Sequence, residues 1–209
     1  MIEKVKKYPI IPLFYHDDVV YAQQVVKACY EGGARFFEFT NRGEKAFENF
    51  KILRGYITEN CPDMVFGIGT IYTAEDAERF IEIGADFIVQ PVIVAEVAAV
   101  CNKHNKPWIP GALTLNEIYQ AHLLGATIVK IFPGNAVGPD YIKGCLGPMP
   151  FVKMMITGGV EPTIESVSSW LNAGATCVGL GSQLFKGNFT DDFSPITDKI
   201  RVIMKYLDS

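Results

Sequence analysis

The sequence predicts a (β/α)8 barrel, the TIM-barrel arrangement of the α/β class, formed by a single domain over residues 1–209. Three observations predict it: a repeated Gly-Ala pair, a regular alternation of helical and apolar segments, and strand segments that are apolar almost throughout. Strands of this kind are typical of a parallel sheet that is covered on both faces. Eight strand–helix units in 209 residues make a barrel slightly smaller than the usual size of about 250 residues.

The repeated unit is a helical stretch followed by Gly-Ala and then by an apolar strand. The four Gly-Ala pairs begin at Gly33, Gly84, Gly125 and Gly174. A glycine after a helix adopts the left-handed conformation that ends the helix, and the small alanine lets a strand begin at once. The pattern therefore predicts strands within residues 31–40, 82–91, 123–133 and 172–182.

Four further apolar segments lie between these units and complete the set of eight strands. They are short and bounded by proline or glycine, which is tolerated where no ladder N–H is needed. Their ranges are 9–15, 64–70, 107–113 and 151–159.

Helical patterns, with apolar residues three and four positions apart, separate the strands. Thr73 stands where an N-cap is expected, directly before the third of them. The barrel is expected over about residues 9–187, and an amphipathic helix over about residues 194–207. The helices of the barrel are expected at residues 19–32, 46–57, 74–84, 94–104, 115–125, 139–147 and 163–174.

The composition is that of a soluble globular protein, with 49% hydrophobic and 20% charged residues, a net charge of −4 and a pI of about 5.4. There is no cluster of Lys and Arg, which argues against nucleic acid or an anionic membrane as the main partner. No apolar run approaches the ~18 residues that span a bilayer, and the first residues lack a signal-peptide core. We expect a cytoplasmic protein that binds a small molecule.

The cysteines and histidines do not form a recognisable site. The five cysteines are widely spread without a CxxC pair, so reduced structural thiols are expected. The three histidines lack the spacing of metal ligands. We therefore expect neither a metal nor a cofactor.

Lys130 and Glu38 are charged residues inside apolar strands, where burial of a lone charge is costly. Both lie near the carboxyl ends of their strands, where barrel enzymes carry their active sites. They belong to the sixth and second strands, and alternate strands share one interior layer of side chains. One interpretation is a buried structural ion pair. The other is covalent catalysis, in which a neutral lysine amine forms a Schiff base and the carboxyl group moves protons.

Flexible backbone follows the last two strands, in ITGGVEP and VGLGS. Loops at these two places form the usual phosphate site of the fold. Gly158, Gly159, Gly181 and Ser182 are therefore candidates for binding an anion, although ordinary turn formation would also explain the glycines.

Three further residues end or follow strands at the same edge of the barrel. Arg42, four residues after Glu38, is either a partner for a phosphate or carboxylate or a solvated loop residue. Thr70 ends the third strand, and Thr114 follows the fifth; each is placed to bind a substrate or to cap the next helix.

Together these residues resemble the 2-keto-3-deoxy-6-phosphogluconate (KDPG) and 4-hydroxy-2-oxoglutarate (KHG) aldolases, a class I aldolase family. The resemblance covers about residues 9–187 and rests on EGGARFFEFTNR, GIGTIYTAEDAERFIEIGADFIVQP, IPGALTLNEI, GATIVKIFP, TGGVEP and GLGS.

The resemblance implies roles for the candidate residues, no metal, and commonly a homotrimer. It implies that Lys130 forms the Schiff base with the 2-oxo group and that Glu38 is the general acid/base. Arg42, Gly158, Gly159 and Ser182 would face the phosphate end of the substrate. The pyruvyl half would be lined by Thr70 and Thr157, with Pro91 and Phe132 as pocket walls.

The sequence departs from the family at three places around this pocket. Phe14 and Tyr15 stand at the end of the first strand, where many members carry an arginine. Gln90-Pro91-Val92 replaces a Ser-Pro-Gly, and Gly134 replaces an alanine. The reaction type is therefore better specified than the substrate.

The expected reaction is cleavage of a 2-keto-3-deoxy-6-phospho sugar acid to pyruvate and glyceraldehyde 3-phosphate. Cleavage of 4-hydroxy-2-oxoglutarate to pyruvate and glyoxylate is a further expectation, and the galactonate epimer is an alternative substrate. A phosphate-binding barrel isomerase or epimerase, with Lys130 stabilising an enolate, is the rival enzyme class. A sugar-phosphate-binding protein without catalysis is a third possibility.

Overall fold

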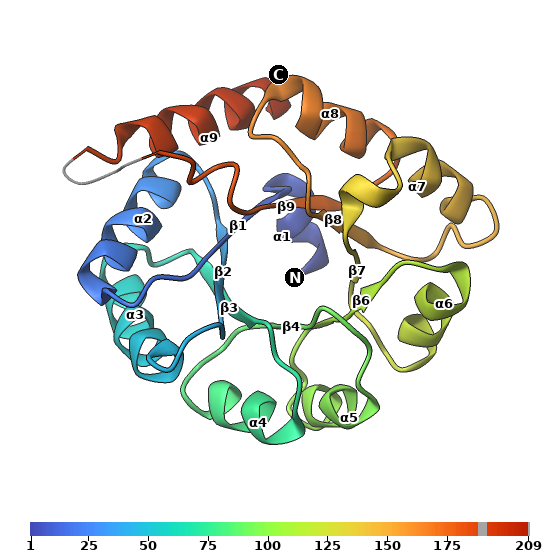
Figure 1. Ribbon diagram of the computed structural model, residues 1–209, viewed down its shortest axis with the longest axis horizontal. Helices are drawn as coiled ribbons and strands as arrows, with labels where there is room; N and C mark the ends of the chain where they lie inside the picture. Colours follow the sequence, from blue (N-terminus) through green and yellow to red (C-terminus); the bar gives the residue numbers. More distant parts are fainter. Residues whose placement is uncertain (188–191, 209) are drawn as a thin grey trace.

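The computed structural model describes residues 1–187 and 192–208. Residues 188–191 and 209, which belong to the single domain expected over the whole chain, lie outside this part. Parallel strands form a ring with helices around its outside, as Figure 1 shows. The expected barrel of the α/β class is confirmed.

The ring closes through the fifth strand, which proline divides into two short segments. β5 (Trp108–Ile109) pairs with β4, and β6 (Gly111–Ala112) pairs with β7. Pro110 between them has no N–H, but its carbonyl accepts a hydrogen bond of 2.7 Å from the amide of Lys130. The sheet order is β5-β4-β3-β2-β1-β9-β8-β7-β6.

The other strands lie at the expected places, each within its predicted range. They are β1 (Ile10–Phe14), β2 (Phe36–Thr40), β3 (Val65–Gly69), β4 (Ile88–Val89), β7 (Val129–Ile131), β8 (Met154–Thr157) and β9 (Cys177–Leu180).

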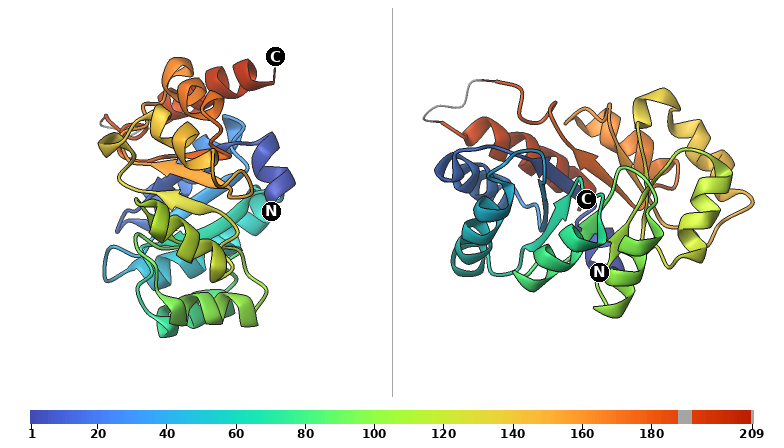
Figure 2. Two further views of the ribbon diagram at one scale, coloured as in Figure 1. Left: turned by 90° about the vertical axis from the view of Figure 1, so that its right-hand side faces the viewer. Right: turned by 60° about the horizontal axis from the view of Figure 1, so that its bottom comes forward.

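The helices alternate with the strands and pack on the outside of the ring, as two further views in Figure 2 show. The helices that follow strands are α2 (Val19–Glu31), α3 (Ala46–Asn60), α4 (Ala74–Glu82), α5 (Ala95–Lys103), α6 (Leu115–Leu123), η1 (Gly134–Ala136), α7 (Pro139–Leu146), α8 (Ile164–Asn172) and α9 (Ser194–Leu207).

Among the described residues, two helices were not expected: the short η1, and α1 (Ile2–Lys7), which lies across the amino-terminal end of the barrel, in the middle of the ring in Figure 1. Val5 is its only fully buried residue and joins the apolar cluster inside the barrel. Six residues with four charges have too little apolar periodicity to reveal a helix in the sequence.

Local chemistry explains where the repeated units begin and end. The four glycines of the Gly-Ala pairs have φ between 91° and 107°, as the left-handed helix ends require. Thr73 caps α4 by accepting from the amide of Asp76. Thr114 forms a capping box with Glu117 at the start of α6, which settles its role in favour of capping.

The inside of the barrel is filled with apolar side chains toward its amino-terminal end. Interior residues lie at every second position of each strand, as the period of a strand requires. The cluster contains Val5, Ile11, Phe36, Phe87, Val89, Ile109, Ile128, Met155 and Cys177, all essentially inaccessible to solvent.

Among the described residues, no helix is both long and apolar enough to cross a membrane.

Candidate functional site

Lys130 and Glu38 both point into the barrel. Each lies two residues after a member of the interior cluster, Ile128 on the approach to β7 and Phe36 on β2, so each faces the same way. They are almost completely buried, with exposures of 5% for Lys130 and 1% for Glu38. The carboxyl ends of the strands therefore hold an amine and a carboxyl group where the amino-terminal end holds only apolar side chains.

The two groups attract each other without forming a direct ion pair. Among the described residues, no salt bridge within 4.0 Å joins Lys130 to a carboxylate. The Lys130 ammonium nitrogen lies 5.2 Å from the centre of the Phe132 ring. Because contact with Glu38 does not hold this amine, a structural ion pair does not explain its burial.

Glycine makes room for the carboxyl group of Glu38. A Cβ atom at Gly69, on β3, would overlap Glu38 Oε1. Within the part of the chain that the structure describes, Glu38 Oε2 is buried without a hydrogen-bond partner. A buried acceptor that lacks a partner is costly, and it marks a place that a bound molecule would satisfy.

Burial moves the pKa of both groups toward their neutral forms. Loss of solvent raises the pKa of Glu38 above its ordinary value, against an opposing effect of the Lys130 and Arg42 charges. Loss of solvent likewise lowers the pKa of Lys130, opposed by Glu38 and assisted by Arg42. More of the lysine is therefore available as a neutral amine than in water, which is what nucleophilic attack requires.

Thr157 supplies a second polar atom without a partner. It lies two residues after the interior residue Met155 on β8 and is 4% exposed. Its hydroxyl has no hydrogen-bond partner in the described residues. It faces Gly179 of β9, where a Cβ would lie 2.7 Å from the hydroxyl oxygen. The site thus has a second group that is free to bind a substrate.

Arg42 and Thr70 are next to each other at the rim. Arg42 Nε donates a hydrogen bond of 3.4 Å to Thr70 Oγ1. The charge of Arg42 also acts on both Glu38 and Lys130. Arg42 is therefore a cation beside the buried pair, which favours the binding interpretation over that of a distant loop residue.

Arg42 also lines a cavity of about 370 Å³ at the mouth, together with Ser182. Its walls include Phe14, whose ring centre lies 4.8 Å from that of Phe185. Thr40 of β2 lines it too and was not singled out from the sequence, although it follows Glu38 by the two-residue period of a strand. The remaining lining residues are Leu13 and Tyr15.

Pro91 and Phe132 lie together in a different cavity, of about 380 Å³. Pro91 approaches β6 so closely that a Cβ at Gly111 would overlap its carbonyl. The structure thus brings the two expected wall residues together, but at the ends of β4 and β7, across the ring from the cavity that Arg42 lines beside β1, β2 and β9.

Gly158 and Gly159 form a turn with positive φ values of 91° and 75°. They pack under η1, so closely that a Cβ at Gly159 would overlap the Asn135 side chain. Gly181 lies beside Leu13, 3.3 Å from a leucine methyl group if it carried a Cβ. Among the described residues, the cavity at Arg42 is lined by Ser182 but by none of these glycines. Close packing and turn formation are therefore reasons for glycine at these positions.

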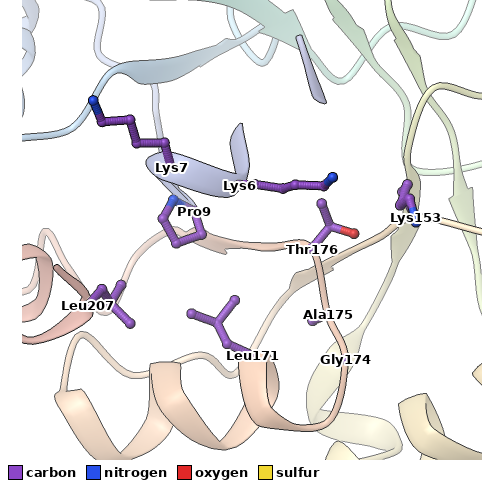
Figure 3. Close-up of a pocket in the computed structure, with 9 residues that line it drawn as sticks. All are labelled: Lys6, Lys7, Pro9, Lys153, Leu171, Gly174, Ala175, Thr176 and Leu207. Atoms are coloured by element: carbon purple, nitrogen blue, oxygen red, sulfur yellow. The ribbon is translucent and has the colours of Figure 1, made fainter. Parts of the chain in front are cut away.

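A further hollow of about 410 Å³ lies at the opposite end of the strands, as Figure 3 shows. Its residues include Lys6 and Lys7 of α1 and Lys153, which stands just before β8. Lys6 pairs with Glu3 at 2.9 Å and is half exposed. These amines differ from Lys130 in exposure, and they lie at the end of the barrel away from the buried Glu38.

Known proteins resemble this chain over most of its length. The family model described as KDPG and KHG aldolase matches residues 1–199. A 2-dehydro-3-deoxy-phosphogluconate aldolase from Treponema pallidum is 32% identical over 161 residues, covering 77% of this chain and 73% of that protein. A 2-dehydro-3-deoxy-6-phosphogalactonate aldolase from Escherichia coli is 34% identical over 123 residues, covering 58% and 59%.

A solved structure also superposes on nearly the whole chain. The KDPG aldolase from Legionella pneumophila, with pyruvate captured as a covalent carbinolamine intermediate, gives a TM-score of 0.84 at 25% identity. It covers 97% of this chain and 98% of its own. With the family model matched over almost all residues, this chain belongs to the KDPG and KHG aldolase family.

Proposed function

We propose that the protein is a class I aldolase that cleaves a 2-keto-3-deoxy-6-phospho sugar acid to pyruvate and glyceraldehyde 3-phosphate. The observation that carries the proposal is the buried Lys130 amine, without an ion pair among the described residues and in the same barrel interior as the unpartnered carboxyl oxygen of Glu38. A buried amine and a buried carboxyl group contribute weakly to stability compared with apolar packing, so the burial of Lys130 and Glu38 needs a chemical reason.

The chemistry begins with attack of the neutral Lys130 amine on the C2 carbonyl of the substrate. The hydroxyl of the carbinolamine takes up a proton from solvent and leaves as water, which gives a protonated imine. Glu38 then removes the proton of the C4 hydroxyl, the C3–C4 bond breaks, and its electrons move toward the imine nitrogen. The aldehyde leaves, C3 of the enamine takes a proton, and water releases pyruvate and the free amine.

Arg42 and Thr70 would bind the carboxylate of the 2-oxo acid, which places Arg42 at the pyruvyl half instead of the phosphate end that the resemblance implies. Arg42 lies near enough to Lys130 and Glu38 to influence both of their pKa values, and it contacts the Thr70 hydroxyl. An arginine next to a hydroxyl matches the oxygens of a carboxylate. The buried Thr157 hydroxyl would satisfy its missing hydrogen bond on the same bound acid.

The phosphate would lie at the outer end of the site. Ser182 lines the cavity that Arg42 enters, and the turn at Gly158 and Gly159 follows the next strand, β8. Backbone N–H groups in turns with positive φ are common anion ligands. Gly181, next to Ser182, would let the phosphate approach the backbone.

A second candidate substrate is the galactonate epimer. It differs from the gluconate compound at one stereocentre, and one of the relatives is named for it. Pyruvate release should be measured with both phosphorylated acids and with 4-hydroxy-2-oxoglutarate, which lacks phosphate. We expect the fastest turnover with one of the phosphorylated acids; faster turnover with the unphosphorylated acid would contradict the phosphate assignment.

The Schiff base is tested by adding borohydride together with pyruvate. We expect irreversible inactivation that needs both reagents, because only reduction of the imine leaves pyruvate attached to the lysine through a stable C–N bond. An isomerase or epimerase that used Lys130 without a covalent bond would keep its activity under the same treatment. A protein that only binds sugar phosphates would release no pyruvate from any of the three acids.

We also propose that the protein is a homotrimer. Leu115, Tyr119 and Leu123 lie one turn apart along α6 and are 48%, 45% and 59% exposed. They form an apolar stripe of the kind that subunit contacts cover. Leu123→Glu should lower the mass measured by sedimentation, whereas Val20→Glu, an equally exposed position on α2, should not. A monomeric wild-type protein would refute the trimer.

A cytoplasmic location is the last part of the proposal. All five cysteines are buried free thiols in the described residues, as expected where thiols stay reduced. Cell fractionation with an antibody to the protein would test it, and recovery from another compartment would refute it.

A further inference from the structure

Thr70 has a backbone conformation that its side chain disfavours. Its φ is +64°, in the left-handed region, where a β-branched residue is a genuine outlier. Such a conformation persists only where the surrounding structure holds it. The residue is also the one whose hydroxyl accepts the hydrogen bond from Arg42 Nε. Whatever holds the backbone at Thr70 therefore also sets the position of that hydroxyl.

The backbone on both sides of Thr70 is fixed by neighbouring strands. The carbonyl of Gly69, before it, accepts from the amide of Asn41 at 2.8 Å. The amide of Ile71, after it, donates to the carbonyl of Val89 at 3.3 Å. A further backbone group beside this turn, the carbonyl of Ile71, accepts a hydrogen bond from a side chain.

That side chain is Gln90, at the end of β4 and completely buried. Its Nε2 donates to the carbonyl of Ile71 at 3.0 Å. Its Oε1 accepts from the indole Nε1 of Trp108 at 2.7 Å. Because the indole nitrogen only donates, it directs the amide oxygen toward itself and the NH2 group toward Ile71.

We propose that Gln90 is a positioning residue for substrate binding, acting through the turn that presents Thr70 to Arg42. Trp108 orients the Gln90 amide, the amide holds the carbonyl of Ile71, and the strained residue before it is kept where its hydroxyl meets Arg42. This inference rests on the proposed function, in which Arg42 and Thr70 bind the carboxylate of the 2-oxo acid. Val89, the residue before Gln90, points into the barrel, so the Gln90 side chain points outward. It acts on the substrate only through its contacts with Trp108 and Ile71.

The variant that tests this role is Gln90→Met, which keeps the side-chain length and removes both hydrogen bonds. The readout is the pyruvate concentration that half-saturates borohydride inactivation. We expect that concentration to rise about tenfold, the change that ~1.4 kcal/mol of binding free energy corresponds to. The rate of inactivation at saturating pyruvate should change less than twofold, because Lys130 is untouched.

Thr197→Val is the matched control. Thr197 is also buried, and its hydroxyl donates to a backbone carbonyl, that of Ala28, at 3.0 Å. The bond joins α9 to α2 on the outside of the barrel, away from the mouth. Its loss should lower the free energy of unfolding and leave the half-saturating pyruvate concentration unchanged.

Thr70→Gly tests whether Gln90 acts through Thr70. Glycine adopts φ of +64° without strain and has no hydroxyl to position. We expect Thr70→Gly alone to raise the half-saturating pyruvate concentration. Adding Gln90→Met to this variant should raise that concentration by less than a further twofold. If Gln90→Met does not fold, Trp108→Phe replaces it: Gln90 stays but loses its orienting donor, and we expect a rise of about threefold.

The outcomes separate this inference from the proposed function. Absence of trapping in the wild-type protein would refute the aldolase chemistry itself. Suppose that the wild-type protein is trapped normally, and that Gln90→Met or Trp108→Phe needs the same half-saturating pyruvate concentration as Thr197→Val. That result would overturn the role of Gln90. A full tenfold effect of Gln90→Met in the Thr70→Gly background would overturn the route through Thr70.

Discussion

The two ends of the barrel differ in chemistry although they are built from the same strands. At the amino-terminal end, Val5 of α1 and the rings of Phe36 and Phe87 belong to a tightly packed apolar cluster. Two residues further along the strands, the interior holds Lys130 and Glu38. Both sets are buried, but only the second includes polar atoms without partners in the described part of the chain.

The comparison shows how burial can serve two different purposes. Apolar burial stabilises the fold by roughly 25 cal/mol per Å² of surface removed from water. Burial of an amine and a carboxyl group costs free energy and changes their pKa values instead. The amino-terminal end thus provides stability that allows the carboxyl end to hold a costly site.

Replacement of the buried amine should give the largest effect. Lys130→Met removes the nucleophile, and we expect turnover to fall by about 10⁴-fold or more. The variant should nevertheless be more stable than the wild-type protein in chemical denaturation at neutral pH, because an apolar side chain avoids the cost of burying an amine.

The stability gain of Lys130→Met should depend on pH. The native pKa of Lys130 is lowered below its ordinary value of 10.5, so the gain is complete below the native pKa and disappears as the pH rises to about 10.5. Lys153→Met is the control at the other end, with turnover unchanged. A gain in stability that does not vary with pH would contradict the burial effect.

At the packed end, Phe36→Ala should reverse this pattern. Removing a buried ring should cost about 3–5 kcal/mol of the free energy of unfolding. The half-saturating pyruvate concentration, measured where the variant is still folded, should stay within about twofold of the wild-type value. A large loss of pyruvate binding by fully folded Phe36→Ala would show that packing at the amino-terminal end affects the site at the carboxyl end.

Glu38→Gln should separate proton transfer from Schiff-base formation. We expect turnover to fall about a hundredfold, the lower range for loss of a general acid/base, while borohydride and pyruvate still inactivate the variant. Because burial raises the native pKa of Glu38, its ionised form destabilises the native state. The variant's stability gain should be absent below about pH 4.5, grow as the pH rises from there to the raised native pKa, and stay constant above it.

Equal stability of Glu38→Gln and wild type at every pH would contradict that shift. Complete loss of trapping in this variant would assign Glu38 to imine formation and leave the cleavage step without its base.

The smallest effect is expected from Thr157→Val. Its hydroxyl has no partner within the described residues, so its loss should change the free energy of unfolding by less than about 0.5 kcal/mol. The half-saturating pyruvate concentration should rise about five- to tenfold, because a hydrogen bond to the bound acid is lost. Equal pyruvate binding by Thr157→Val and the wild-type protein would show that the Thr157 hydroxyl does not bind the substrate.

Much of the fold follows from patterns in the sequence. The Gly-Ala pairs and apolar segments locate the strands because helix ends and buried strands have local requirements. The two-residue period then places Lys130 and Glu38 inside once the barrel is known. α1 escapes this reasoning because only one of its residues, Val5, is buried, and it packs against strands that are distant in the sequence.

The details of the rim depend on contacts between distant segments. Nothing in the local sequence indicates that Thr70 adopts a positive φ, which Gln90 and its neighbours impose from another strand. The turn at Gly159 likewise takes its place from Asn135, which follows β7. Sequence patterns identify such residues as candidates, but the cavity that each one lines is decided by tertiary packing.

The most direct test is to locate the reduced pyruvate adduct by peptide mass spectrometry after borohydride treatment. We expect one carboxyethyl group per chain, on Lys130, and none on Lys6, Lys7 or Lys153. Lys130→Met should remain unmodified under the same conditions. Modification of a different lysine, or an unmodified wild-type protein at saturating pyruvate, would contradict the claim that the barrel buries this amine to form a Schiff base.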